Sequence, residues 1–218
     1  MLRAGIVSSG KSPDMTWFKS AGDLSQLQLR MIETAVEKIH AAPDGATFWV
    51  QGGAGTGKTI VLSHIARRLK AEQSNLRIIF LTYTHALKGM IQQAVNESGS
   101  DAQVSTYMKF LHTEESRYDV ILLDEVQDVK RVDLQALRRR CRHLVVAGDC
   151  EQRIYEDGNT EDAIDETIKF EKGRLLELFR ITKLIVRAVK SILPDTKLTE
   201  ADVRKMRDVT AAVKRFDD

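Results

Sequence analysis

The chain has 218 residues, 43% of them hydrophobic and 29% charged, with a formal net charge of +2. This composition predicts one globular domain, with or without a small appendage, and the charge is too small to indicate nucleic-acid binding by itself. No apolar run approaches the roughly 20 residues that span a bilayer, and the first residues lack the apolar core of a signal peptide. Cys141 and Cys150 suggest neither a metal site nor a disulfide framework, so we expect a cytoplasmic protein.

The first half of the chain alternates between predicted helices and strands. Residues 1–22 show no hydrophobic periodicity, and we expect an N-terminal arm there. From Leu24 apolar residues recur at helical spacing, with Asp23 or Ser25 as the cap, until a turn at 43–45. A strand at 47–51, a glycine-rich loop and a helix at 59–71 follow. A second buried strand at 76–82 precedes a helix that ends near Glu97.

The second half continues the alternation. Strands are predicted at 103–106, 119–123 and 144–147, with a weaker one at 175–178, and helices at 107–111, 131–140, 182–192 and 199–215. Near-continuous apolar strands between helices are typical of a parallel sheet that is covered on both faces. We therefore predict an α/β fold, with one domain at 23–193 and a C-terminal helical extension at 194–218.

The segment GGAGTGKT between the first strand and its helix fits the phosphate-binding pattern G-x-x-x-x-G-K-[ST]. Glycines allow successive backbone N–H groups to turn toward a triphosphate, and the following helix directs its positive end at the same phosphates. Lys58 is expected to reach the β- and γ-phosphates, and the Thr59 hydroxyl to bind Mg²⁺. The predicted nucleotide-binding residues are Gly52, Gly53, Ala54, Gly55, Thr56, Gly57, Lys58 and Thr59.

A triphosphate site also needs a carboxylate at the end of a neighbouring strand. Asp124 and Glu125 directly follow the strand at 119–123, so we expect Asp124 to hold Mg²⁺ and Glu125 to act as general base toward water. Alternatively, the Asp124–Glu125 pair is part of a solvated turn without a catalytic role. Gln152 follows the next strand and could orient the water or sense the γ-phosphate, or it could be a surface residue of a turn.

The order of these segments resembles superfamily 1 helicases of the UvrD/Rep type. The matching segments are LSQLQ at 24–28 (the Q motif), GGAGTGKT at 52–59 (motif I), LTYTHAL at 81–87 (motif Ia), VSTYM at 104–108 (motif Ib), DEVQD at 124–128 (motif II), GDCEQRIY at 148–155 (motif III) and LLELFR at 175–180 (motif IV). The resemblance implies a RecA-like P-loop NTPase domain with ATP and Mg²⁺ as cofactors.

The resemblance also implies roles for individual residues. Gln28 would hydrogen-bond the adenine edge, Phe179 would stack on the adenine ring, and Arg180 would contact the γ-phosphate. Gln152 would couple the state of the phosphates to the nucleic-acid-binding face. Single-stranded nucleic acid would contact motifs Ia and Ib, with Tyr83 as a stacking platform for a base. Alternatively, Tyr83 and Tyr107 are half-buried aromatics. The nucleic-acid candidates are Tyr83, Thr84, Thr106 and Tyr107.

The chain departs from the family in three places. Only a short stretch separates motifs Ib and II, where the family inserts a helical subdomain. Motif III is followed by acidic residues, where the family has an aromatic residue and Arg-Gly-Ala. The sequence ends at Asp218, before any counterpart of motifs V and VI. A second domain or a partner protein is therefore expected to complete the ATP site, in line with the effect of an arginine supplied in trans.

Three functions remain open on the sequence. The first is a helicase-like ATPase, for which the basic segment 130–142 could bind nucleic acid, although a solvated helix face explains the same charges. The second is a nucleotide-dependent switch or adaptor for a protein partner, which the missing DNA-binding parts of the family and the acidic segment 151–166 both favour. The third, a small-molecule kinase, would leave DEVQD and GDCEQRIY without a role.

Overall fold

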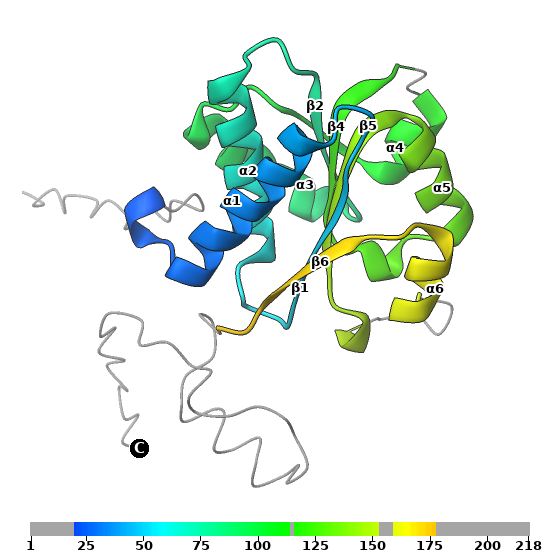
Figure 1. Ribbon diagram of the computed structural model, residues 1–218. Coiled ribbons are helices and arrows are strands. Elements are labelled where there is room, and N and C mark those ends of the chain that lie inside the picture. The colour runs from blue at the N-terminus through cyan, green and yellow to red at the C-terminus, as the bar shows by residue number, and fades with distance from the viewer. Residues whose placement is uncertain (1–19, 114–115, 153–158, 178–218) are drawn as a thin grey trace, which may run out of the picture.

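The computed structural model describes residues 20–113, 116–152 and 159–177. Within these ranges six strands form one parallel sheet in the order β3-β2-β4-β5-β1-β6 (Figure 1). The strands are β1 (Thr47–Gly52), β2 (Ile78–Thr82), β3 (Gln103–Thr106), β4 (Tyr118–Leu123), β5 (Cys141–Gly148) and β6 (Glu171–Leu175). The predicted α/β class, with a parallel sheet and helices on both faces, is confirmed.

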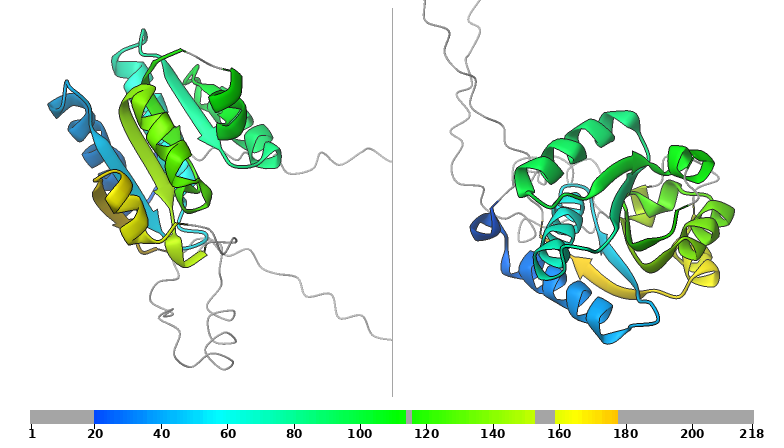
Figure 2. Two further views of the ribbon diagram at one scale, coloured as in Figure 1. Left: turned by 90° about the vertical axis from the view of Figure 1, so that its right-hand side faces the viewer. Right: turned by 90° about the horizontal axis from the view of Figure 1, so that it is seen from above.

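Three helices cover each face of the sheet in the described part of the chain. α1 (Gln26–Ala41), α2 (Lys58–Glu72) and α3 (His85–Ser98) lie on one face, and α4 (Tyr107–Thr113), α5 (Arg131–Arg139) and α6 (Glu161–Thr167) lie on the other (Figures 1 and 2). Short 3-10 turns, η1 (Ala21–Asp23), η2 (Val126–Asp128) and η3 (Cys150–Gln152), complete the elements. None of the described helices is long and apolar enough to cross a membrane.

Successive side chains of each central strand enter opposite halves of the core. On β2, Ile78 and Phe80 pack toward α1–α3, whereas Ile79 and Leu81 pack toward α4–α6. All four are at most 2% exposed. A strand that is buried on both faces needs apolar residues at every position, and this is why the central strands could be predicted from continuous apolar runs.

The last strand differs from its predicted position. It runs over Glu171–Leu175 and not over 175–178, and its residues are polar apart from Leu175. β6 is the edge of the sheet beside β1, so much of it faces solvent and the apolar signal is missing. Gly173 lies so close to Met31 of α1 that a Cβ there would overlap the Met31 sulfur. α6 was not predicted at all. The predicted helices at 182–192 and 199–215 lie outside the described residues.

A buried histidine ties the start of β1 to β5. Nδ1 of His143 accepts a hydrogen bond from the Ala46 backbone N–H at 3.0 Å, and the residue is 5% exposed. Burial, followed by the charges of Arg142 and Arg138, lowers the pKa of His143 from 6.5 to about 4. The imidazole therefore stays neutral in the folded protein over a pH range in which the unfolded chain takes up a proton.

This difference predicts a loss of stability in mild acid. Between pH 6.5 and 4 the unfolded state binds more protons, so the free energy of unfolding falls as the pH falls, by about 2–3 kcal/mol for this residue alone. Urea unfolding of wild type and His143→Asn at a series of pH values measures the effect, because an Asn carbonyl can still accept from Ala46. Equal pH dependence in the two proteins would contradict the prediction.

Candidate active site

Four of the predicted functional segments meet at the carboxyl end of the sheet. Because the strands run parallel, their carboxyl ends lie together, and this is where α/β sheets bind ligands. The phosphate loop at 52–59 follows β1, Tyr83 and Thr84 follow β2, Asp124 and Glu125 follow β4, and Asp149 follows β5. β5 lies between β1 and β4, so the phosphate loop and Asp124 belong to strands that are not direct neighbours.

The phosphate loop is a tight turn between β1 and α2. Gly55 and Gly57 have φ angles of 78° and 87°, in the left-handed region that favours glycine. The Thr56 hydroxyl donates to the Gly53 carbonyl at 2.9 Å and closes the turn. α2 begins at Lys58, so the free N–H groups of its first turn open onto the loop. This is the arrangement of backbone and helix that binds phosphate groups.

The ammonium group of Lys58 lies over the loop. It donates to the carbonyls of Gly52 at 2.7 Å and Gly53 at 3.1 Å, and the residue is only 7% exposed. The positive charge is thus held among the backbone groups that form the predicted phosphate site.

One hydrogen bond joins the phosphate loop to the predicted metal-binding carboxylate. The Thr59 hydroxyl donates to Oδ2 of Asp124 at 2.6 Å, although the two residues are 65 positions apart. Asp124 is 1% exposed, and burial, followed by the charge of Glu125, raises its pKa from 3.8 to about 6. A hydroxyl and a carboxylate are oxygen ligands of the kind that Mg²⁺ prefers. The two oxygens that sequence reasoning assigned to a metal are therefore brought together.

Glu125 adopts an uncommon backbone conformation. Its φ of 56° lies in the left-handed region, one of two such non-glycine residues in the described chain. Its backbone N–H donates to Oδ1 of Asp124 at 3.1 Å, and its carboxylate accepts from Nε2 of Gln127 at 2.8 Å. Strained backbone of this kind clusters at functional sites. Sequence reasoning quoted Gln127 within DEVQD but gave it no role.

Gln28 lies against the phosphate loop. Its side chain and that of Ser25 form a capping box at the start of α1. The other end of the amide, Nε2, donates to the Thr56 carbonyl at 3.0 Å, and a Cβ at Gly57 would overlap this nitrogen. Gln28 is 4% exposed. In this structure the amide predicted to contact adenine supports the loop itself.

The four nucleic-acid candidates differ in exposure. Tyr107 and Thr106 are each 4% exposed. Tyr107 packs in the core against the ring of Tyr83, with ring centroids 5.7 Å apart. Tyr83 is half-buried, and exposed Thr84 caps α3 by accepting from the Leu87 N–H. The burial of Tyr107 favours the alternative of a packed aromatic for this residue, and Thr106 is buried as well.

The remaining predicted residues are described in part or not at all. Gln152 ends η3 directly after β5, at the same edge of the sheet. Phe179 and Arg180 lie outside the described residues.

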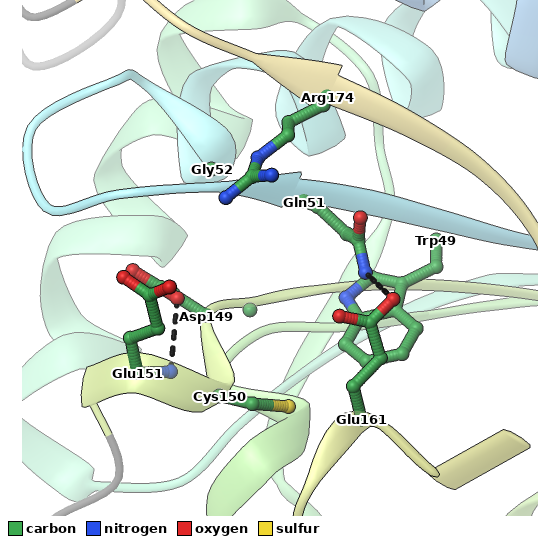
Figure 3. A pocket seen from close by; sticks show the side chains of 9 residues that line it. Trp49, Gln51, Gly52, Asp149, Cys150, Glu151, Glu161 and Arg174 are labelled. Atoms are coloured by element: carbon green, nitrogen blue, oxygen red, sulfur yellow. Dashed lines mark hydrogen bonds between the residues drawn. The ribbon is translucent and has the colours of Figure 1, made fainter. Parts of the chain in front are cut away.

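A polar pocket that sequence reasoning did not identify opens beside the phosphate loop (Figure 3). Gln51 donates to Glu161 at 2.9 Å on one side of it, and the guanidinium group of Arg174 lies above Asp149 and Glu151 on the other. Nε1 of buried Trp49 has no hydrogen-bond partner among the described residues. The pocket is lined by Trp49, Gln51, Gly52, Gly148, Asp149, Cys150, Glu151, Glu161 and Arg174.

Several charges of the acidic and basic segments are used within the fold. Glu161 and Asp165 of α6 both contact Lys172, and Glu166 pairs with Arg131 at 3.4 Å. In the basic segment, Arg138 donates to two β5 carbonyls at 3.2 Å, and Arg140 donates to carbonyls of α4 at 3.3 Å. These contacts support structural roles for part of both segments.

Comparison with known proteins identifies the family. A model described as an AAA domain matches residues 34–157, which is more than half of the chain. The chain belongs to this AAA domain family. The matched range begins within α1 and runs past β5, so it contains both the phosphate loop and Asp124. No curated protein sequence matches the chain.

Solved structures that align with the chain include helicases and an ATPase core. The arterivirus nonstructural protein 10 helicase aligns with a TM-score of 0.51 and 18% identity, over 74% of this chain and 42% of that chain. Pif1 helicase from Candida albicans aligns at 0.43 and 19%, over 72% and 40%, and the Sulfolobus solfataricus SWI2/SNF2 ATPase core aligns at 0.47 and 14%, over 58% and 32%. The chain thus spans less than half the length of these three proteins. At such identities the similarity to the arterivirus protein supports a shared fold only.

Proposed function

We propose that this chain is a helicase-like motor-core domain of the UvrD/Rep type that binds Mg·ATP and hydrolyses it. The observation that carries the proposal is the 2.6 Å hydrogen bond between Thr59 and Asp124, beside the buried ammonium group of Lys58. A phosphate loop alone would support nucleotide binding. The adjoining carboxylates add the groups that phosphoryl transfer to water requires.

Each residue has a defined task in this proposal. The loop N–H groups and Lys58 bind the β- and γ-phosphates, while Thr59 and Asp124 hold Mg²⁺, which neutralises charge on the phosphate oxygens. Glu125 takes the proton from the attacking water. Within the described residues no three His, Cys, Asp or Glu side chains converge as a metal site, so the nucleotide itself would supply the other ligands.

The finer assignments follow the resemblance to UvrD/Rep helicases. We propose that Gln28 and Phe179 bind the adenine, that Gln152 and Arg180 respond to the γ-phosphate, and that residues 23–193 form the ATPase domain between the arm at 1–22 and the extension at 194–218. Single-stranded nucleic acid would cross the carboxyl edge of the sheet, with Tyr83 as the stacking surface. The buried residues Tyr107 and Thr106 would support Tyr83 from within the core. A further domain or partner would supply the rest of the ATP site.

ATP turnover with and without single-stranded DNA or RNA tests the motor proposal. We expect the oligonucleotide to stimulate turnover, and the stimulation to fall as salt increases, because binding to phosphates releases counterions. Double-stranded DNA of the same length serves as the control. Absence of stimulation together with absence of strand binding at low salt would contradict the proposal.

That same outcome would favour the nucleotide-dependent switch or adaptor. One of its two supports was the acidic segment 151–166, but Glu161, Asp165 and Glu166 pair with basic residues of this chain. The acidic residues therefore supply less free charge for a partner than the sequence suggested.

A further inference from the structure

The side chain of Gln127 joins the ends of two neighbouring strands at the candidate active site. Its Nε2 donates to Oε2 of Glu125, just after β4, at 2.8 Å. Its Oε1 accepts from the backbone N–H of Asp149, just after β5, at 3.2 Å. Gln127 is 2% exposed, so water has little access to either end of this amide.

The residues around this pair of hydrogen bonds are closely packed. β5 ends at Gly148, where a Cβ would overlap Oε1 of Gln127 and clash with Val126. The Gln127 backbone carbonyl also accepts from the Asn159 N–H at 2.8 Å, and the Asn159 side chain donates to the Val129 carbonyl. The η2 turn is therefore attached to Asp149 on one side and to Asn159 on the other.

An amide donates from its nitrogen and accepts at its oxygen, so one uncharged side chain makes both bonds. An ionised glutamate at the same position could accept from Asp149 but could not donate to Glu125, and a methionine could do neither well. The backbone of Glu125 lies in the left-handed region, which non-glycine residues rarely adopt. Because this conformation is strained, a hydrogen bond from a neighbouring residue matters more for holding the Glu125 side chain in place.

We propose that Gln127 is a positioning residue that orients the carboxylate of Glu125 and makes this orientation depend on the position of Asp149, just after β5. This inference rests on the proposed function, in which Glu125 is the general base. Movement of Asp149 shifts Oε1, and the rigid amide transfers that shift to the hydrogen bond with Glu125. The η3 turn, Cys150–Gln152, begins directly after Asp149, so a shift of η3 would reach Glu125 by this route.

Two substitutions at Gln127 separate positioning from support of the fold. Gln127→Glu keeps the acceptor for Asp149 and, when its carboxyl is ionised at alkaline pH, has no donor for Glu125, whereas Gln127→Met removes both groups. We expect each to lower kcat for ATP at least about tenfold, with ATP affinity changed less than about threefold, because hydrogen bonds to charged groups contribute about 1.5–3 kcal/mol. If only the bond to Asp149 matters, Gln127→Glu keeps full kcat at alkaline pH, and the inference is overturned.

Gln93→Glu is the matched control. Gln93 also donates its amide to a carboxylate, that of Glu97 at 2.7 Å, but on the exposed side of α3. This variant introduces the same charge beside a glutamate away from the site, and its kcat should equal that of wild type. An equal loss of kcat in Gln93→Glu and Gln127→Glu would overturn the inference.

A measurement without turnover separates this inference from the proposed function. Hydrogen exchange of the Asp149 amide should be faster in Gln127→Met than in wild type, and unchanged in Gln127→Glu. The NMR signals of the Gln127 side-chain amide should move in Glu125→Ala. If the exchange rate of the Asp149 amide and the Gln127 signals change as expected but wild type does not hydrolyse ATP, the proposed function is wrong. The hydrogen-bond bridge through Gln127 is then still supported. Signals that do not respond overturn the bridge, even in an active enzyme.

Discussion

Replacing Glu125 with glutamine is expected to lower ATP turnover by about 10²- to 10⁴-fold, which is the usual contribution of a general base. Glutamine has nearly the same size and its carbonyl can still accept from Gln127, so the phosphate loop and the Thr59–Asp124 contact should be unchanged. ATP should therefore bind and remain uncleaved. Analysis of the nucleotide that stays bound after incubation with Mg·ATP measures this, with ATP expected in the variant and ADP in wild type.

The control for this substitution is Glu97→Gln. Glu97 also accepts from a glutamine amide, that of Gln93, but it lies on the exposed side of α3. We expect wild-type turnover in this variant. Turnover that persists in Glu125→Gln would show that Glu125 is not the base, and the roles proposed for both Glu125 and Gln127 would have to be abandoned.

Substitution of Lys58 with alanine is expected to weaken ATP binding by about 10- to 100-fold, because a charge-assisted hydrogen bond contributes about 1.5–3 kcal/mol. The structure holds the lysine against the phosphate loop through the carbonyls of Gly52 and Gly53. Equilibrium binding of a fluorescent ATP analogue measures the loss.

Lys70→Ala provides a matched control on the same helix. The Lys70 ammonium donates to the Ser74 carbonyl at the far end of α2, in an exposed position. The two variants remove the same charge from the same helix, but only one removes it from the loop. Equal affinity for the nucleotide in Lys58→Ala and Lys70→Ala would rule out a role of Lys58 in binding phosphates.

The central strands and the helices between them could be predicted from the sequence, because their burial on both faces requires continuous apolar residues. Phe80 and Leu81, for example, are neighbours in the chain and lie in opposite halves of the core. β6 could not be placed this way, since an edge strand with the sequence Glu-Lys-Gly-Arg-Leu carries no apolar run. Only its pairing with β1 defines it.

The candidate site was predictable where its chemistry lies in a continuous segment. The phosphate loop and the Asp124–Glu125 pair each follow a strand directly, and the parallel sheet brings them to one edge. The role of Gln127 could not be predicted, since Asp149 is 22 positions away and only the pairing of β4 with β5 brings the two together. The burial of Tyr107 likewise depends on tertiary packing, which the spacing of aromatic residues does not reveal.

Calorimetric titration of ATP into the full chain, with Mg²⁺ and with a chelator, tests the central claim most directly. That claim is that the phosphate loop and the β4 carboxylates form one Mg·ATP site. We expect one nucleotide bound per chain, tighter binding in the presence of Mg²⁺, and little binding in Lys58→Ala. Absence of binding to the wild-type chain, or binding that neither Mg²⁺ nor Lys58→Ala changes, would contradict the claim.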